Sequence, residues 1–241
     1  MKKFLTSLFT VMIILGIAGT IGSYKDAMTV FSGKTIDFNS STLADYDEEA
    51  MIEGEIYYVY DYFAVEEVTN TTYGIKTGST ETYFYLVESY NKEWFLDESD
   101  EYEPVSMIYS TSDKDEIAKL DKMVEDWYAF EDAYYNAESE DDIPDVPKDT
   151  FKFEGFVSEC PDAKILEFRK EYIIETLGYP AEEADEFIAE YCSDMIIEKG
   201  DPAQVKMLFF IAIGVGVAGI IGLIATLVAS SVRKKKDEEL Y

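Results

Sequence analysis

The residues of this chain whose types could do chemistry are mostly acidic. The chain contains 50 Asp and Glu residues against 20 Lys and Arg, and it has no His. Without histidine, Ser-His-Asp and Cys-His triads, histidine acid–base catalysis and most zinc sites are excluded. The catalysis that remains is carboxylate chemistry, such as glycoside hydrolysis by two acids roughly 5–9.5 Å apart. Because any of so many acids could form such a pair, we assign no catalytic residue.

Clusters of acids are candidates for cation binding, because Ca²⁺ prefers several carboxylate oxygens. The clusters are Asp45, Asp47, Glu48 and Glu49; Asp97, Glu98, Asp100 and Glu101; and Glu138, Glu140, Asp141 and Asp142. None of them has the twelve-residue EF-hand pattern with its central Gly and final Glu. We therefore interpret the clusters as solvated acidic surface and predict no metal ligand.

The two cysteines, Cys160 and Cys192, allow two interpretations. One is a single disulfide, which an extracytoplasmic location permits. The other is a pair of small buried thiols. The chain has no CxxC pattern, which argues against a redox or zinc role for either residue.

Tyrosines are the other abundant side chains with binding chemistry, 19 in all. The densest group could line a carbohydrate or peptide surface, and it consists of Tyr57, Tyr58, Tyr60, Tyr62, Tyr83 and Tyr85. Adjacent residues of a strand face opposite sides of the sheet, so both faces would receive aromatic rings. This pattern favours core packing over a binding platform.

Two uncharged runs predict membrane-spanning helices. Residues 4–22 form a run of 19 residues, which is ~29 Å long as a helix and matches a bilayer core of ~30 Å. The alternative for this run is a cleaved signal peptide, but its length and the lack of an Ala-x-Ala site favour a retained anchor. Residues 207–232 form a second run, of 26 residues. It follows Gly200, Asp201 and Pro202, which mark a helix start.

The charges around these two runs predict the topology. Lys2 and Lys3 precede the first run, and a basic cluster at residues 233–236 follows the second, so both termini are expected in the cytoplasm. Six of the 20 bases and three of the 50 acids lie outside residues 24–206, which leaves 14 bases and 47 acids there, a net charge of −33. This acidic segment is then extracytoplasmic, and its charge excludes nucleic acid as a partner.

The second apolar run contains a motif that resembles a cofactor site. Gly214, Gly216 and Gly219 spell GxGxxG, but in mid-membrane the pattern lacks the strand and the water that dinucleotide binding needs, so we predict no cofactor. Small residues also recur at every fourth position and predict close helix packing, either within the chain or in a homodimer. They are Gly214, Ala218, Gly222 and Thr226, followed by Ser230.

The segment between the two runs has the pattern of an α+β domain. Strands are expected over residues 51–68, 73–89, 105–109 and 151–157, with a turn at Lys76–Ser79. Helices are expected from a cap formed by Asp113 and Glu116 to Tyr134, over residues 161–177 and over residues 180–200. The predicted fold is a small antiparallel β-sheet or partial barrel followed by helices, flanked by two transmembrane α-helices.

The layout of the chain and the segment EGEIYYVYDYFAVEE, residues 53–67, resemble uncharacterised two-pass bacterial membrane proteins with an extracytoplasmic α+β domain. The resemblance implies location in the cell membrane and no specific activity. The predicted parts are an N-terminal anchor at residues 1–23, an acidic extracytoplasmic domain at 24–206, a transmembrane helix at 207–232 and a basic cytoplasmic tail at 233–241.

These observations favour a non-enzymatic, membrane-anchored interaction module whose partners are membrane lipids and another membrane or surface protein. The alternative is a surface sensor or binding module for cations or saccharides. A carboxylate-based hydrolase is the third interpretation.

Overall fold

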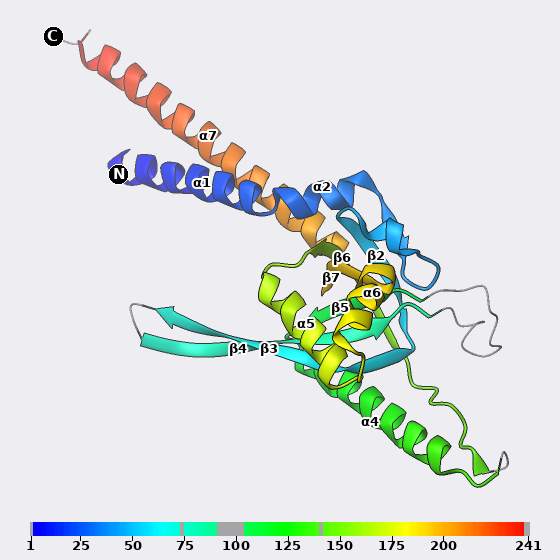
Figure 1. Ribbon diagram of the computed structural model, residues 1–241. Coiled ribbons are helices and arrows are strands. Elements are labelled where there is room, and N and C mark those ends of the chain that lie inside the picture. The colour runs from blue at the N-terminus through cyan, green and yellow to red at the C-terminus, as the bar shows by residue number, and fades with distance from the viewer. Residues whose placement is uncertain (1, 73–74, 91–103, 140–141, 239–241) are drawn as a thin grey trace. The chain divides into compact units, whose positions relative to one another are not determined.

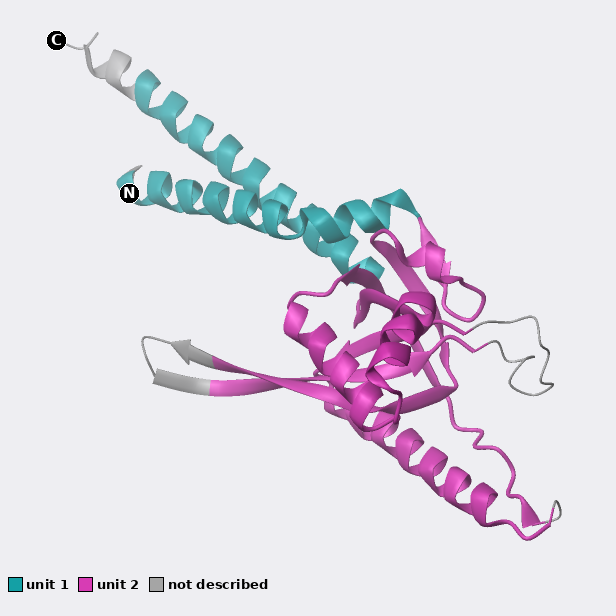
Figure 2. Cartoon of the chain, in the orientation of Figure 1, with its two compact units in different colours: residues 1–33, 201–241 teal, residues 34–200 magenta. Residues whose placement is uncertain are grey.

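A computed structural model describes residues 2–72, 75–90, 104–139 and 142–238. The chain forms two compact units, which Figure 2 shows in different colours. The first unit comprises residues 1–33 and 201–241, and the second comprises residues 34–200. The described part of the first unit is helical, and the second unit combines helices with a sheet, so the predicted α+β class is confirmed.

The first unit consists of helices α1 (Lys2–Gly22), α2 (Tyr24–Ser32) and α7 (Pro202–Glu238). Two spans among the described residues are long and apolar enough to cross a membrane, Lys3–Gly22 in α1 and Pro202–Val232 in α7. Most large apolar side chains of both spans are exposed. A core helix of a soluble protein would instead bury them, so the surface of this unit suits a lipid environment.

Helices α1 and α7 pack closely at small residues and run antiparallel. A Cβ atom added to Gly16 would lie 2.5 Å from Gly216 Cα, and one added to Gly219 would lie 2.9 Å from Ile13 Cγ1. Only glycine allows two helix backbones to approach so closely. Because a later residue of α1 contacts an earlier residue of α7, the N-terminus of α1 and the C-terminus of α7 lie at the same end of the pair (Figure 1).

The second unit is built on a seven-stranded sheet with the strand order β1-β2-β6-β7-β5-β4-β3. The strands are β1 (Thr35–Asp37), β2 (Ala50–Ile56), β3 (Tyr58–Thr72), β4 (Ile75–Glu88), β5 (Ser106–Thr111), β6 (Phe151–Glu159) and β7 (Cys192–Lys199). Strands β1 and β2 are parallel, as are β5 and β7, and the other neighbours are antiparallel. The prediction of an antiparallel sheet is therefore wrong, and the sheet is mixed.

The unexpected parallel pair arises from strand β7, where the sequence predicts a helix over residues 180–200. Helix α6 (Ala181–Tyr191) ends early, and the chain then enters the middle of the sheet. Ile196 and Ile197 are both buried, in clusters on opposite faces of the sheet. A central strand covered on both faces reads as a continuous apolar run, which periodicity does not distinguish from a buried helix.

Helices cover both faces of the sheet. Helix α4 (Lys114–Asn136) contributes Leu120 and Met123 to the main core. Phe38 and Tyr46 join the same core from the segment that contains the short 3₁₀ helix η1 (Leu43–Tyr46). Helix α5 (Ala163–Glu175) and α6 pack on the other face. The sheet has free ends at β1 and β3, so the partial-barrel alternative is wrong. A sheet packed between two helical layers already buries both faces without closing on itself.

Strands β3 and β4 continue beyond the rest of the sheet as a two-stranded ribbon (Figure 1). Strand β5 pairs with β4 only from Glu88 back to Tyr83, whereas the pairing of β3 with β4 continues to Thr72 and Ile75. The turn predicted at Lys76–Ser79 is therefore wrong, because these residues lie within strand β4. Glycine and serine favour turns, but here they do not interrupt the pairing of β4 with β3, which the residues on both sides continue.

Candidate functional site

An open groove formed by described residues lies between the β3–β4 ribbon and the first turns of helix α4. Its volume is about 660 Å³. Strand β4 contributes one wall, helix α4 contributes the other, and the end of β5 closes the groove. The lining residues are Ser79, Thr80, Glu81, Tyr83, Ser112, Lys114, Ile117, Ala118 and Asp121.

Asp121 is held in this groove by a buried tyrosine. Tyr85 is fully buried, and its hydroxyl donates a hydrogen bond of 2.7 Å to Asp121 Oδ1. The start of helix α4 is fixed in turn by Asp113, whose side chain accepts a hydrogen bond of 3.0 Å from the Asp115 backbone nitrogen, as the predicted cap requires. A bonded carboxylate on a capped helix is held in one geometry before a ligand arrives.

The Tyr83 ring lines the same groove as Asp121, and the Tyr62 ring packs against it. The rings of Tyr62 and Tyr83 meet edge to face with centroids 5.3 Å apart, and Tyr83 stacks on Tyr85 at 6.4 Å. Tyr62 is 45% exposed, whereas Tyr85 is buried in the core. The predicted tyrosine group is therefore divided: Tyr83 lines the groove and Tyr62 packs on its ring, whereas Tyr85 lies in the core.

The electrostatic environment of the groove is negative. Burial raises the pKa of Asp61, and the nearby Asp121 carboxylate raises it further. The pKa of Tyr83 is also raised, by burial and then by Glu81. Across the ribbon, Glu67 pairs directly with Glu81, although like charges at such a position destabilise a sheet. Among the described lining residues, Lys114 is the one base.

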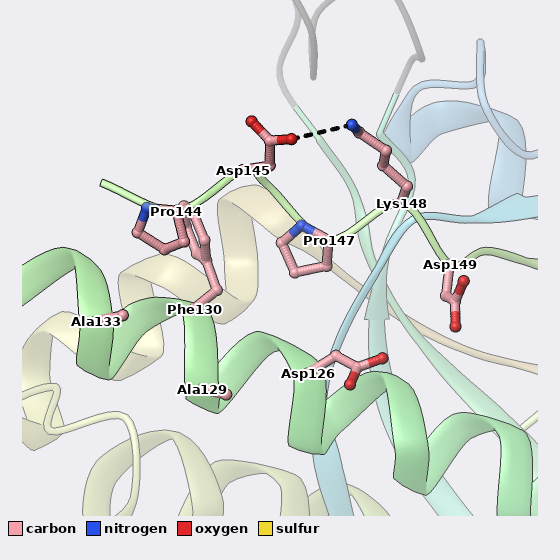
Figure 3. Close-up of a pocket in the computed structure, with 9 residues that line it drawn as sticks. All are labelled: Asp126, Ala129, Phe130, Ala133, Pro144, Asp145, Pro147, Lys148 and Asp149. Atoms are coloured by element: carbon pink, nitrogen blue, oxygen red, sulfur yellow. Dashed lines mark hydrogen bonds and ion pairs between the residues drawn. The ribbon is translucent and has the colours of Figure 1, made fainter. Parts of the chain in front are cut away.

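A smaller groove of about 340 Å³ lies between the second half of α4 and the loop residues 144–149, which precede strand β6. Figure 3 shows Phe130 and Ala133 of the helix facing Pro144 and Pro147 of the loop. Its acids Asp126 and Asp149 are both paired with Lys122, at 2.6 and 2.5 Å. Asp145 and Lys148 of the lining pair with each other at 3.3 Å, and the other lining residues are apolar. Because each of its acids already has a lysine partner, this groove offers little to recognise a charged ligand.

A buried polar cluster surrounds Glu88 near the end of strand β4. Glu88 is 5% exposed, and its Oε1 accepts hydrogen bonds from Tyr60 at 2.6 Å and Ser106 at 3.3 Å. Among the described residues no donor reaches its Oε2 in hydrogen-bond geometry. Burial raises the pKa of Glu88, and the Tyr60 hydroxyl partly opposes this shift. The carboxyl has the raised pKa that catalytic acids often have, but its side chain is buried among the described residues.

A second polar network joins strand β7 to helix α4. Lys199, the last residue of β7, lies 2.6 Å from Glu116 and 3.0 Å from Asp113. Tyr109 and Thr111 donate hydrogen bonds to Glu116 Oε2 at 3.1 and 2.7 Å. Glu116 was expected to complete the helix cap, but its side chain contributes to this network instead. The network ties the end of β7 to the helix that forms one wall of the groove.

Cys160 and Cys192 are not bonded to each other in this structure. Cys192 begins β7 and packs with Leu86, Ile173 and Ala184, whereas Cys160 follows β6 and contacts a separate cluster on the same face. Burial raises the pKa of Cys192 to about 11. The structure places the thiols in two different apolar clusters, and the disulfide stays a prediction.

Several acids of the predicted clusters have structural partners. Asp45 Oδ2 accepts hydrogen bonds from the backbone nitrogen and the hydroxyl of Thr42 at the start of η1, and Glu48 lies 3.5 Å from Lys34. No three His, Cys, Asp or Glu side chains within the described ranges converge to hold a metal ion. The cluster at residues 97–101 and the acids at 140 and 141 lie outside those ranges.

The small residues predicted to pack helix α7 are distributed over two of its faces. Gly214 and Ala218 are exposed, and an added Cβ at Gly214 would meet nothing within 4 Å. Gly222 and Thr226 are half-buried, and Gly222 lies against the ring of Phe9. The contact surface with α1 is therefore rotated toward Gly216 and Gly219, which the sequence presents only as members of the GxGxxG pattern.

Sequence reasoning did not find the groove. Lys114, Ile117 and Asp121 are visible in the sequence only as positions on an amphipathic helix, and Glu81 is one acid among many. What joins them is the point at which β5 stops pairing with β4, which has no local signal. No protein-family model, curated protein sequence or solved structure matches this chain.

Proposed function

We propose that this protein is a membrane-anchored, non-enzymatic binding module whose acidic unit is exported and takes up a partner in the groove beside β4. Support comes first from the helices. The antiparallel packing of α1 and α7 brings the end that begins with Lys2 and Lys3 to the same side as the cluster at residues 233–236. By the positive-inside rule that side is cytoplasmic, and the acidic segment emerges from the other end of both helices.

The single observation that carries the binding function is the open groove with exposed polar and aromatic walls. Tyr83, Glu81 and Asp121 line it, and within the described ranges none of them is paired with a base in the manner of Asp126 and Asp149 in the smaller groove. Exposed tyrosine rings beside fixed carboxylates are typical of recognition surfaces. Glu88 has the enclosed environment that catalytic acids often have. Its side chain bonds to Tyr60 and Ser106 on the face of the sheet opposite to α4 and does not line the groove.

A saccharide-binding module is the second candidate. It is favoured by the ring of Tyr83, which lines the groove together with the hydrogen-bonded carboxylate of Asp121 and is packed against the exposed ring of Tyr62. Aromatic rings bind the apolar faces of sugars while carboxylates accept their hydroxyl hydrogen bonds. Hydrolysis would in addition require the Glu81 and Asp121 carboxyls to act as a pair, which would give a bell-shaped dependence of rate on pH.

Site-specific photo-crosslinking in native membranes tests the binding function. A photoreactive residue replaces Thr80 in the groove, and a matched variant carries it at Glu171, an exposed position on α5. We expect a discrete adduct with another protein from position 80 and none from position 171. A solitary monomer at both positions would contradict the proposal.

Protease treatment of protoplasts or spheroplasts tests the topology. Cleavage within residues 34–200 with protection of a C-terminal tag is expected. The converse pattern would place the acidic unit in the cytoplasm and remove the basis for an exported module.

A further inference from the structure

Strand β4 has an open edge where its neighbour β5 ends. Strand β5 pairs with β4 as far as the Thr111–Tyr83 pair, and the chain then leaves the sheet to begin helix α4 at Lys114. Among the described residues, the part of β4 beyond Tyr83 is hydrogen-bonded to β3 on one side only. Its other edge therefore presents unpaired backbone groups, which are a template for another strand.

The groove occupies the place where a continuation of β5 would run. The open edge comprises residues 75–82 of β4, and three of the four residues nearest Tyr83 line the groove together with it, namely Ser79, Thr80 and Glu81. The opposite wall is formed by Lys114, Ile117 and other residues of α4. An extended peptide rises about 3.3 Å per residue, so a segment of about four residues could pair with this edge. Side chains on one face of that segment would then face α4.

The charges of the groove determine what such a segment must carry. Glu81 and Asp121 line it against a single base, Lys114, among the described lining residues. A lysine or arginine placed there would be attracted to the two carboxylates and could contact the Tyr83 ring as a cation–π partner. A second copy of this chain is disfavoured, because two segments with a net charge of −33 repel each other.

We infer that the groove binds an extended, lysine- or arginine-containing segment of a partner protein, which adds as a strand to the open edge of β4 beyond Tyr83. This inference rests on the proposed binding function and names the class of partner. Backbone hydrogen bonds to the edge supply affinity, and the carboxylates of the groove supply the preference for a basic segment.

Binding of short peptides to the full-length chain in nonionic detergent tests the inference. The probe is an end-blocked peptide of alternating lysine and threonine. One control peptide has N-methyl groups on alternate backbone nitrogens, and another has glutamate in place of lysine. We expect saturable binding of the first peptide, binding at least about tenfold weaker for the N-methylated one, and none for the glutamate peptide. Hydrogen exchange of residues 79–82 should slow when the first peptide binds.

Two variants test whether peptide binding depends on the acids of the groove or on the overall negative charge of the domain. Glu81→Gln combined with Asp121→Asn should weaken binding at least about tenfold, because both charges are lost while the introduced asparagine amide can still accept the Tyr85 hydrogen bond. The matched control is Glu66→Gln, an exposed acid on the other face of the same ribbon, which should change binding less than about twofold.

Three results would overturn the inference: equal weakening by the two variants, full binding of the N-methylated peptide, or no binding of the lysine–threonine peptide. The proposed function has its own readout in the crosslink from position 80. A crosslinked adduct without peptide binding would refute the inference of a basic extended segment but would leave the proposed binding function standing. Absence of both would refute both.

Discussion

Replacement of Glu88 by Gln should stabilise the acidic unit at neutral pH. The carboxyl is 5% exposed, its Oε1 accepts hydrogen bonds from Tyr60 and Ser106, and no donor within the described ranges reaches Oε2. Glutamine retains an accepting oxygen for Tyr60 and Ser106 and carries no charge, so the cost of burying a carboxylate is removed. Burying a polar group without full hydrogen bonding costs about 1–3 kcal/mol, and more when the group is charged, so we expect the free energy of unfolding to rise by about 1–3 kcal/mol at neutral pH.

The dependence of this gain on pH follows from the direction of the pKa shift. Burial raises the pKa of Glu88 in the folded state above its ordinary value of 4.5. A raised pKa means that the folded state is favoured while Glu88 is protonated. The contribution to stability is therefore complete below pH 4.5 and is lost as the pH rises through the folded-state pKa. The difference between the glutamine variant and the parent should be small near pH ~4 and largest above pH ~7.

Chemical denaturation of the full-length protein in nonionic detergent measures this difference, with tryptophan fluorescence as the signal. Trp127 is buried in the described core and reports its unfolding. Comparison at each pH cancels the contributions of the other acids, which both proteins share. The control Glu167→Gln removes an exposed acid from α5 and should change stability by less than about 0.5 kcal/mol. Destabilisation by Glu88→Gln at pH ~8, or a difference independent of pH, would refute the reasoning.

Other predictions concern the helix pair, the thiols and the link to α4. Gly16→Ala should destabilise the α1–α7 pair by about 1–3 kcal/mol in micelles, measured by thermal unfolding with circular dichroism, whereas Gly214→Ala should be neutral because its Cβ meets no atom within 4 Å. Burial raises the pKa of Cys192 to about 11 from 9.0, so at pH ~8 this residue should hold about 100-fold less thiolate than an ordinary cysteine. Cys160 is less buried, and iodoacetamide should therefore label it first; a disulfide would instead block both until reduction. Lys199→Met should cost about 1–3 kcal/mol in denaturation, because it leaves a mostly buried carboxylate on α4 without its cation.

Elements with a strong local pattern could be predicted from the sequence. Helix α4 begins at its Asp113 cap, and strand β6 begins at Phe151, both where the pattern places them. Strand β7 could not be predicted, because its consecutive isoleucines pack on opposite faces of a sheet assembled from distant strands. The face of α7 that packs against α1 differs from the predicted one for a similar reason, because the position of α1 decides which glycines of α7 are buried.

The sequence by itself determined the two apolar spans, the charge difference between the chain ends and the middle, and the exclusion of histidine chemistry. These are properties of composition and of contiguous stretches, and they require no knowledge of contacts. Only the tertiary structure decided the groove and the environment of Glu88. Asp121 reaches Tyr85 across 36 positions, and Ser106 reaches Glu88 across 18. The pairing of β4 with β5 and the packing of α4 create both neighbourhoods, and these depend on strand order and register, which no local segment specifies.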